Sequence, residues 1–337
     1  MRFETAQEQA EPNSPYAKTP DLPRTQVLSQ VLAEHDLVTR QRRRRVRLLK
    51  DMEALDAAEG VKSATIAFIG SERSYGGAID SDDVPAFGDV LMSVGEVHTL
   101  NLILHTPGGD GNTAEKIIEL CRAYCTRFRV LIPNRAKSAG TMIALGADEI
   151  VMGYCSELGP IDAQIPIVVA GLPRYISAQS FINAKQELLK EYQQLTAAKQ
   201  DTKPALHQLL TLDLPFIDHC KKLMDFGRDV ARKNLDSHMF SGIKNKAARE
   251  KAIENVLNEL SLTEKFKVHG RMIDANAAKT QLKLNVRVLA KDHPLWKALW
   301  MYYIRADVLL SGRHLGTTVK LIESRSEALM RSVPLTA

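Results

Sequence analysis

The sequence contains few cysteines and no long apolar run, and both absences narrow its class. Only four of the 337 residues are cysteines, and none forms a CxxC pair or joins a histidine at zinc spacing. We therefore expect reduced thiols, a cytoplasmic location, and neither a metal nor an organic cofactor. No segment reaches the roughly 18 apolar residues of a membrane helix, and residues 1–25 have no apolar core of a secretory signal. No membrane span is expected.

Apart from one short basic segment, the chain is close to neutral in net charge. The net charge is +5, and a basic run at residues 40–50 includes Arg42–Arg45. The apolar residues within this run favour a solvated helix face, and a partner or an anionic surface at Arg42–Arg45 is the second hypothesis. Salt-dependent nucleic-acid binding through these arginines is a weaker one.

The periodicity of apolar residues divides the chain into parts. Residues 1–25, rich in proline and polar residues, are expected to be disordered, and residues 26–60 to form a helical arm. Short apolar runs then alternate with helical patterns, which predicts parallel β-α units. Strands are expected at 64–69, 100–104, 128–132 and 150–152, and helices at 84–94, 113–126 and 139–147. We therefore assign residues 61–288 to an α/β domain.

The pattern after about residue 173 predicts helices alone. The expected helices are 177–200, 205–233, 244–260, 274–281 and 292–310. The C-terminal half should therefore be largely helical, with residues 289–337 as a helical extension.

A glycine-rich turn follows the second predicted strand. Residues 105–111 read HTPGGDG and lead into a helix. Glycines allow a sharp turn whose N–H groups point outward, and the helix N-terminus favours negative charge. Such a turn can hold a phosphate or an oxyanion, or it can be a plain tight turn. A P-loop is not indicated, because no Gly-Lys-Ser/Thr follows.

A serine follows the third predicted strand in a similar setting. Ser138 lies within KSAGTM at residues 137–142, at the start of a helix. Its small neighbours leave the hydroxyl accessible, although a helix N-cap is the commoner role for such a serine. The carboxyl ends of parallel strands share one edge of a sheet, so we expect Ser138 and the glycine turn to face one crevice. A nucleophile beside backbone donors is suited to acyl transfer.

These motifs together resemble the serine dehydrogenase proteinase family, distant relatives of Clp protease and signal peptide peptidase A. The resemblance covers about residues 62–288 and is carried by segments 79–83, 105–111, 136–153, 157–164 and 268–273. It implies a Clp/crotonase-like α/β fold with a spiral of β-β-α units, peptide or protein substrates and a homo-oligomer. The charged, leucine-containing arm at 26–60 would suit a contact between protomers.

The resemblance also implies functional residues. Ser138 would be the nucleophile, with Gly109 (and Gly108 beside it) and Ala139 as oxyanion donors.

The general base is left open. The Clp protease histidine would fall within residues 161–164, which contain none. Signal peptide peptidase relatives use a later lysine, for which Lys185 and Lys190 are candidates, although both fit a solvated helix face. The closer family is described as having a Ser/His/Asp set, for which His269 and Asp162 are the candidates here. Each of them could instead have a structural role, in hydrogen bonding or in capping.

Two other functions stay open at this stage. A crotonase-like acyl-thioester enzyme would use the same pair of amides without a nucleophilic serine. A catalytically silent scaffold or binding module is the other, because the expected histidine is missing.

Overall fold

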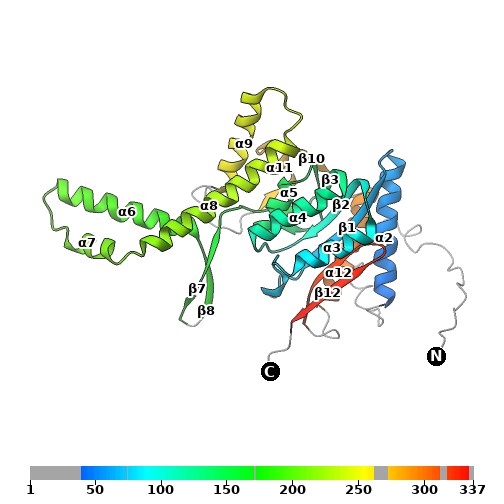
Figure 1. Cartoon of the computed structure of the whole chain (residues 1–337), viewed down its shortest axis with the longest axis horizontal. Helices are drawn as coiled ribbons and strands as arrows, with labels where there is room; N and C mark the ends of the chain where they lie inside the picture. The colour runs from blue at the N-terminus through cyan, green and yellow to red at the C-terminus, as the bar shows by residue number, and fades with distance from the viewer. Residues whose placement is uncertain (1–38, 74, 171, 262–271, 312–316, 334–337) are drawn as a thin grey trace, which may run out of the picture.

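A seven-stranded sheet forms the centre of the molecule (Figure 1). The computed structural model describes residues 39–333 except 74, 171, 262–271 and 312–316. The strand order is β10-β5-β3-β2-β1-β11-β12. The strands are β1 (Ser63–Gly70), β2 (Val97–His105), β3 (Cys125–Ile132), β5 (Glu149–Met152), β10 (Val286–Val288), β11 (Thr317–Glu323) and β12 (Ala328–Val333).

All four predicted strands are confirmed, and so is the mixed α/β class. β1, β2, β3 and β5 are parallel neighbours, as their continuous apolar runs indicated. The finer expectation of a spiral of β-β-α units stays a prediction.

The prediction that strands end near residue 173 is wrong. β10 adds to the sheet parallel to β5, and β11 pairs antiparallel with β1. β12 completes a hairpin with β11, so the C-terminal extension is only partly helical. The pattern missed β11 because Lys320 and Glu323 interrupt its apolar run, yet both are buried against charged partners.

Helices cover both faces of the sheet (Figure 1). α2 (Thr39–Ala58) and α12 (Pro294–Ser311) pack on one face. The other face is covered by α3 (Asp83–Val94), α4 (Gly111–Ala123), α5 (Ala139–Leu145), the end of α8 (Leu214–Asn234), α9 (Lys246–Ser261) and α11 (Ala275–Thr280). The described part of the predicted N-terminal arm is therefore built into the body; residues 1–38 lie outside the described residues.

Two arginines of α2 are bound to the C-terminal hairpin. Arg45 is 2% exposed and makes a bidentate pair with Glu323, at 2.6 and 3.1 Å. Arg42 donates to the Ser326 carbonyl oxygen at 3.3 Å. Helical periodicity therefore turns Arg45 toward the sheet and leaves Arg43 exposed, and a partner or an anionic surface at Arg42–Arg45 stays a prediction for the rest of the run.

A projection leaves the body beside the carboxyl ends of the central strands (Figure 1). It comprises the hairpin of β7 (Gln164–Val169) and β8 (Leu172–Ser177), then α6 (Ala178–Ala197), α7 (Lys203–Leu210) and most of α8. Ala178, Ile182, Ile217, Cys220 and Met224 belong to its own small core. Among the helices within the described ranges, none combines the length and apolar character needed to cross a bilayer.

The remaining elements are short. They are the 3₁₀ turn η1 (Tyr75–Gly77), the π turn η2 (Leu235–Met239), and a small sheet of β4 (Arg135–Ala136), β6 (Glu157–Leu158) and β9 (Ile273–Asp274).

Candidate active site

Two single-residue bridges place the glycine turn against its neighbours. Thr106, just after β2, bridges Ala136: its N–H donates to the Arg135 carbonyl at 2.9 Å, and its carbonyl accepts from the Lys137 N–H at 3.2 Å. The serine loop therefore begins directly beside the start of the glycine turn. This adjacency follows from the parallel order of β2 and β3.

The second bridge joins the turn to the segment after β1. The Ile79 N–H donates to the Gly108 carbonyl at 2.7 Å, and the Asp110 N–H donates to the Ile79 carbonyl at 2.9 Å. Gly109 lies between these bonds at φ 143°, and a β-carbon there would come within 2.2 Å of the Ile79 carbonyl oxygen. Only glycine fits this close approach of two backbones.

Gly108 meets Ser138 directly. Gly108 has φ 118°, and a β-carbon at this position would lie 2.9 Å from the Ser138 β-carbon. The glycine turn and the serine are thus in van der Waals contact, as a shared site requires.

Ser138 itself has an unusual backbone. Its φ is 48° and its ψ is −112°, a conformation that non-glycine residues rarely adopt. It immediately precedes α5, yet its side chain makes no capping hydrogen bond. The structure therefore does not support the simple N-cap role, and the hydroxyl is left facing a cavity.

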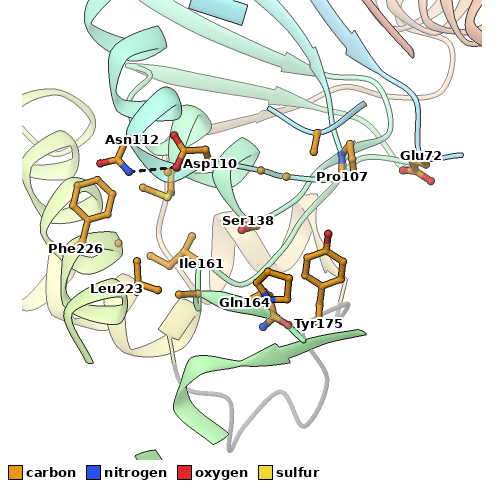
Figure 2. A pocket seen from close by; sticks show the side chains of 18 of the residues that line it. Glu72, Pro107, Asp110, Asn112, Ser138, Ile161, Gln164, Tyr175, Leu223 and Phe226 are labelled. Carbon is orange, nitrogen blue, oxygen red and sulfur yellow. Dashed lines mark hydrogen bonds between the residues drawn. The ribbon is translucent and has the colours of Figure 1, made fainter. Parts of the chain in front are cut away.

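That cavity has a volume of about 1010 Å³, and Ser138 lies in its wall (Figure 2). One side is apolar, with Ile161, Leu223 and Phe226 grouped together. The other side carries Gln164 and Tyr175 from the projection and, farther off, Glu72. The wall also contains Met142, Pro107, Gly108, Gly109 and Gly111.

The backbone donors near Ser138 are not equivalent. The Gly108 N–H donates to the Thr106 Oγ1 at 3.1 Å, and the same hydroxyl donates to the Gly108 carbonyl. Within the described ranges, no protein acceptor binds the N–H of Gly109 or of Ala139. Gly109 and Ala139 are thus the available amides, whereas Gly108 serves as the close-contact residue.

Lys185 and Lys190 are not brought to Ser138. Neither belongs to the cavity wall, and both lie on α6. The Phe181 ring meets the Phe216 ring at 5.0 Å, whereas Phe226 of the cavity is ten residues farther along α8. Lys185 lies about one helical turn beyond Phe181, on the side away from Phe226. Along the projection, Lys185 is therefore on the order of 20 Å from Phe226.

The side chain of Lys137, the residue before Ser138, is bound to other partners. The Lys137 ammonium donates to the Leu158 carbonyl at 3.1 Å and pairs with Glu157 at 3.1 Å. Burial lowers the pKa of Lys137, and the Glu157 pair opposes this shift.

Asp162 lies immediately behind the cavity wall. It is 1% exposed, and its Oδ2 accepts from the Gln164 Nε2 at 2.8 Å. Its neighbours Ile161 and Ala163 line the cavity. His269, its predicted partner, lies outside the described residues.

Sequence reasoning overlooked two acids of the cavity wall. Burial raises the pKa of Glu72, although Arg135 binds it at 2.6 Å. Asp110 is the N-cap of α4: burial opposes its ionisation, but hydrogen bonds from Thr113 hold its pKa below the ordinary value. Asp110 is therefore committed to the helix, and Glu72 is bound to Arg135.

His105 is buried behind the cavity wall, with its Nε2 3.7 Å from the Glu72 Oε1. It is 1% exposed, its Nδ1 accepts from the Arg135 N–H, and its ring packs on Tyr303 at 4.7 Å. Burial, reinforced by the Arg135 charge, lowers its pKa to about 3. Nor do the described residues include a group of three acids, histidines or cysteines arranged to hold a metal.

A family model described as ClpP-like SDH-type serine proteinase matches residues 66–185. Residues 66–185 therefore resemble the serine dehydrogenase proteinase family, as the motifs indicated. The matched segment contains the glycine turn, Ser138 and Asp162, and it ends at Lys185. This family match supports a peptidase function.

Individual relatives cover less of the molecule. Two uncharacterized proteins of Methanocaldococcus jannaschii, MJ0137 and MJ1495, are 44% and 42% identical over 66 residues. The matches span 20% of this chain and 23% of each relative.

Two solved structures are similar at a low level. Both are variants of the 1510-N membrane-bound stomatin-specific protease, one of them in complex with a substrate peptide. The first has 17% identity and a TM-score of 0.28, covering 42% of this chain and 66% of that protein. The second has 18% identity and a TM-score of 0.27, covering 72% and 96%.

Proposed function

We propose that this protein is a serine peptidase that forms an acyl-enzyme on Ser138. The observation that carries the proposal is the position of Ser138: an uncapped serine with φ 48°, in contact with Gly108 and in the wall of a large cavity. A capping serine would not need this strained backbone, which is typical of functional sites.

In the proposed reaction, the Ser138 Oγ attacks the scissile carbonyl carbon while a base takes its proton. The carbonyl oxygen becomes an oxyanion and accepts hydrogen bonds from the Gly109 and Ala139 N–H groups. Each such donor typically contributes about 3 kcal/mol to transition-state stabilisation. The amine leaves with a proton from the base, and water then hydrolyses the Ser138 ester.

We propose His269 as the base and Asp162 as the acid that orients it. Two features support this choice: the buried carboxylate of Asp162 lies between two residues of the cavity wall, and Lys185 on α6 is not part of that wall. Lys185 is the alternative base, in case it reaches the cavity of a second protomer. A homo-oligomer is part of this proposal.

The apolar wall suggests the kind of peptide that binds. Phe226 and Met142 come together over Gly111, where a β-carbon would lie 3.2 Å from the Phe226 ring and 3.5 Å from the Met142 methyl. With Ile161 and Leu223 they would form a subsite for a large apolar side chain next to the scissile bond.

A fluorophosphonate probe tests the nucleophile. It should label the native protein once, at Ser138, and label neither Ser138→Ala nor heat-denatured protein. Ser177→Ala, a serine that caps α6, is the matched control and should be labelled normally. Absence of labelling in the native protein would refute the hydrolase and favour a silent scaffold or a thioester enzyme.

Three variants then identify the base. His269→Gln should lower kcat by at least about 100-fold, as loss of a general base does, and abolish the acid limb of the kcat/KM profile. Lys185→Met and the exposed Lys190→Met should stay within about threefold of the native enzyme. The reverse result would assign the base to Lys185.

A further inference from the structure

The C-terminal hairpin brings a buried cation to the rear of the candidate oxyanion turn. In the register of β1 with β11, Lys320 stands opposite Gly70. The Lys320 ammonium is 1% exposed and lies 2.9 Å from the Asp80 Oδ2 and 2.9 Å from both oxygens of Asp83. β11 lies outside residues 66–185, the segment that the family model matches.

The two aspartates are built into the backbone that supports the turn. Asp83 opens α3, and its Oδ2 accepts from the Asp80 N–H at 2.9 Å. Asp80 immediately follows Ile79, whose N–H and carbonyl hold the Gly108 carbonyl and the Asp110 N–H. Asp80 therefore connects the ion pair with Lys320 directly to Ile79, whose hydrogen bonds fix the turn.

Two cations face the carboxylates of Asp80, Asp82 and Asp83 in this cluster. Arg331 of β12 adds a second cation, with its Nη1 2.6 and 2.5 Å from the Asp80 oxygens. Burial opposes ionisation of Asp80, but Lys320 and Arg331 together hold its pKa below the ordinary value. Burial raises the pKa of Asp83 in spite of Lys320, so this carboxylate depends on its cation.

We propose, on the basis of the proposed peptidase function, that Lys320 is a positioning residue for the oxyanion hole. It holds Asp80 and Asp83, and thereby the Ile79 backbone, in the place that keeps the Gly109 amide fixed relative to Ser138. Lys320 itself touches neither substrate nor Ser138. Its loss should therefore impair the chemical step more than substrate binding.

The test is Lys320→Met, which keeps the length of the side chain and removes the ammonium. We expect kcat to fall about 10- to 100-fold, the effect of a small misplacement of catalytic groups, with KM changed less than threefold. Labelling of Ser138 by fluorophosphonate should slow in proportion. Lys320→Arg, which keeps the charge, should restore a large part of kcat.

Arg45→Met is the matched control. Arg45 also pairs with a residue of β11 in a buried setting, Glu323, but on the other side of the strand and away from Ile79. Both variants lose the cation of a buried ion pair, so both should lower the melting temperature. Arg45→Met should keep kcat within threefold; an equal fall in kcat for both variants would show a purely structural role and overturn the proposal.

Amide hydrogen exchange separates this proposal from the proposed function. In Lys320→Met, exchange of the Ile79 and Asp110 N–H groups, which form the two hydrogen bonds of this bridge, should become at least about tenfold faster, and in Arg45→Met it should not. If exchange is faster in Lys320→Met but the native protein has no peptidase activity, the proposed function is refuted and the positioning of the turn by Lys320 is supported. Unchanged exchange would overturn the positioning role even in an active peptidase.

A milder variant covers the case in which Lys320→Met does not fold. Asp80→Asn removes one negative charge and leaves Asp83 to pair with Lys320. It should shift kcat and turn exchange in the same direction by a smaller factor, and no shift in either would count against the proposal.

Discussion

Gly108 and Ser138 are in contact across the candidate active site: a β-carbon on Gly108 would lie 2.9 Å from the Ser138 β-carbon and 3.1 Å from the Lys137 carbonyl oxygen. The contact joins the two motifs that the sequence places 30 residues apart, and it leaves no room for any side chain at position 108. The position of the serine and the size of residue 108 are therefore coupled.

Gly108→Ala should displace Ser138 and impose strain at φ 118°. We expect a loss of about 2 kcal/mol in unfolding free energy, typical of a strained or overpacked position. Ser138 labelling should slow by at least about tenfold, as for other misplaced catalytic groups. Urea denaturation and labelling kinetics measure the two effects.

Gly88→Ala is the control for this change. Gly88 lies in the interior of α3, where a β-carbon would meet nothing within 4 Å. Alanine there should raise stability by about 0.5–1 kcal/mol through helix propensity and leave labelling unchanged. A Gly108→Ala protein that behaves in the same way would disprove the coupling.

Ser138 should differ from a capping serine in its effect on stability. Its backbone is strained and its hydroxyl caps nothing, so Ser138→Gly should gain about 1 kcal/mol and Ser138→Ala should change stability by less than about 0.5 kcal/mol. The Ser177 Oγ accepts from the Gln179 N–H, and Ser177→Ala should cost about 1 kcal/mol. Equal losses for Ser138→Ala and Ser177→Ala would return Ser138 to an ordinary cap.

The parallel core could be predicted from the sequence because its strands are buried on both faces. The runs ending before Thr106 and Ala136 read as continuous apolar segments, and parallel strands bring their carboxyl ends to one edge. This reasoning predicts that Gly109 and Ser138 share a cavity, and both line the same one. Their catalytic roles stay predictions.

Two features could not be predicted because they depend on tertiary partners. Lys320 and Glu323 look like surface residues of a polar segment, but each is buried against an opposite charge contributed by a distant element. The direction of α6 relative to Ser138 could not be predicted from the sequence either. Helical periodicity identifies the apolar face of Phe181 and Ile182, but it does not tell which end of the helix approaches Ser138.

The neutral, buried His105 should make stability depend on pH. Its pKa is about 3 in the folded protein, against about 6.5 in the unfolded chain, so the unfolded state binds more protons between these values. The contribution is complete above pH 6.5 and is lost as pH falls toward 3, at up to about 1.4 kcal/mol per pH unit.

Urea denaturation at pH 7 and pH 4.5 measures this effect. In His105→Gln, the loss of stability between the two pH values should be smaller than in the native protein by about 2–3 kcal/mol. His207→Gln, on the exposed surface of α7, should leave the pH dependence unchanged. An NMR titration in which His105 gains a proton near pH 6.5 would contradict the assignment.

The apolar wall of the cavity should select the residue next to the scissile bond. Peptides with Leu or Phe at this position should be cleaved at least about tenfold faster than those with Asp, because burying such a side chain contributes about 1.5–3 kcal/mol. Phe226→Ala should lower kcat/KM for the Leu peptide by about tenfold and for an Ala peptide by less than threefold. Leu189→Ala, at an exposed position of α6 outside the cavity wall, is the control and should change neither. Equal losses for both peptides in Phe226→Ala would mean that Phe226 supports the fold of the site rather than its selectivity.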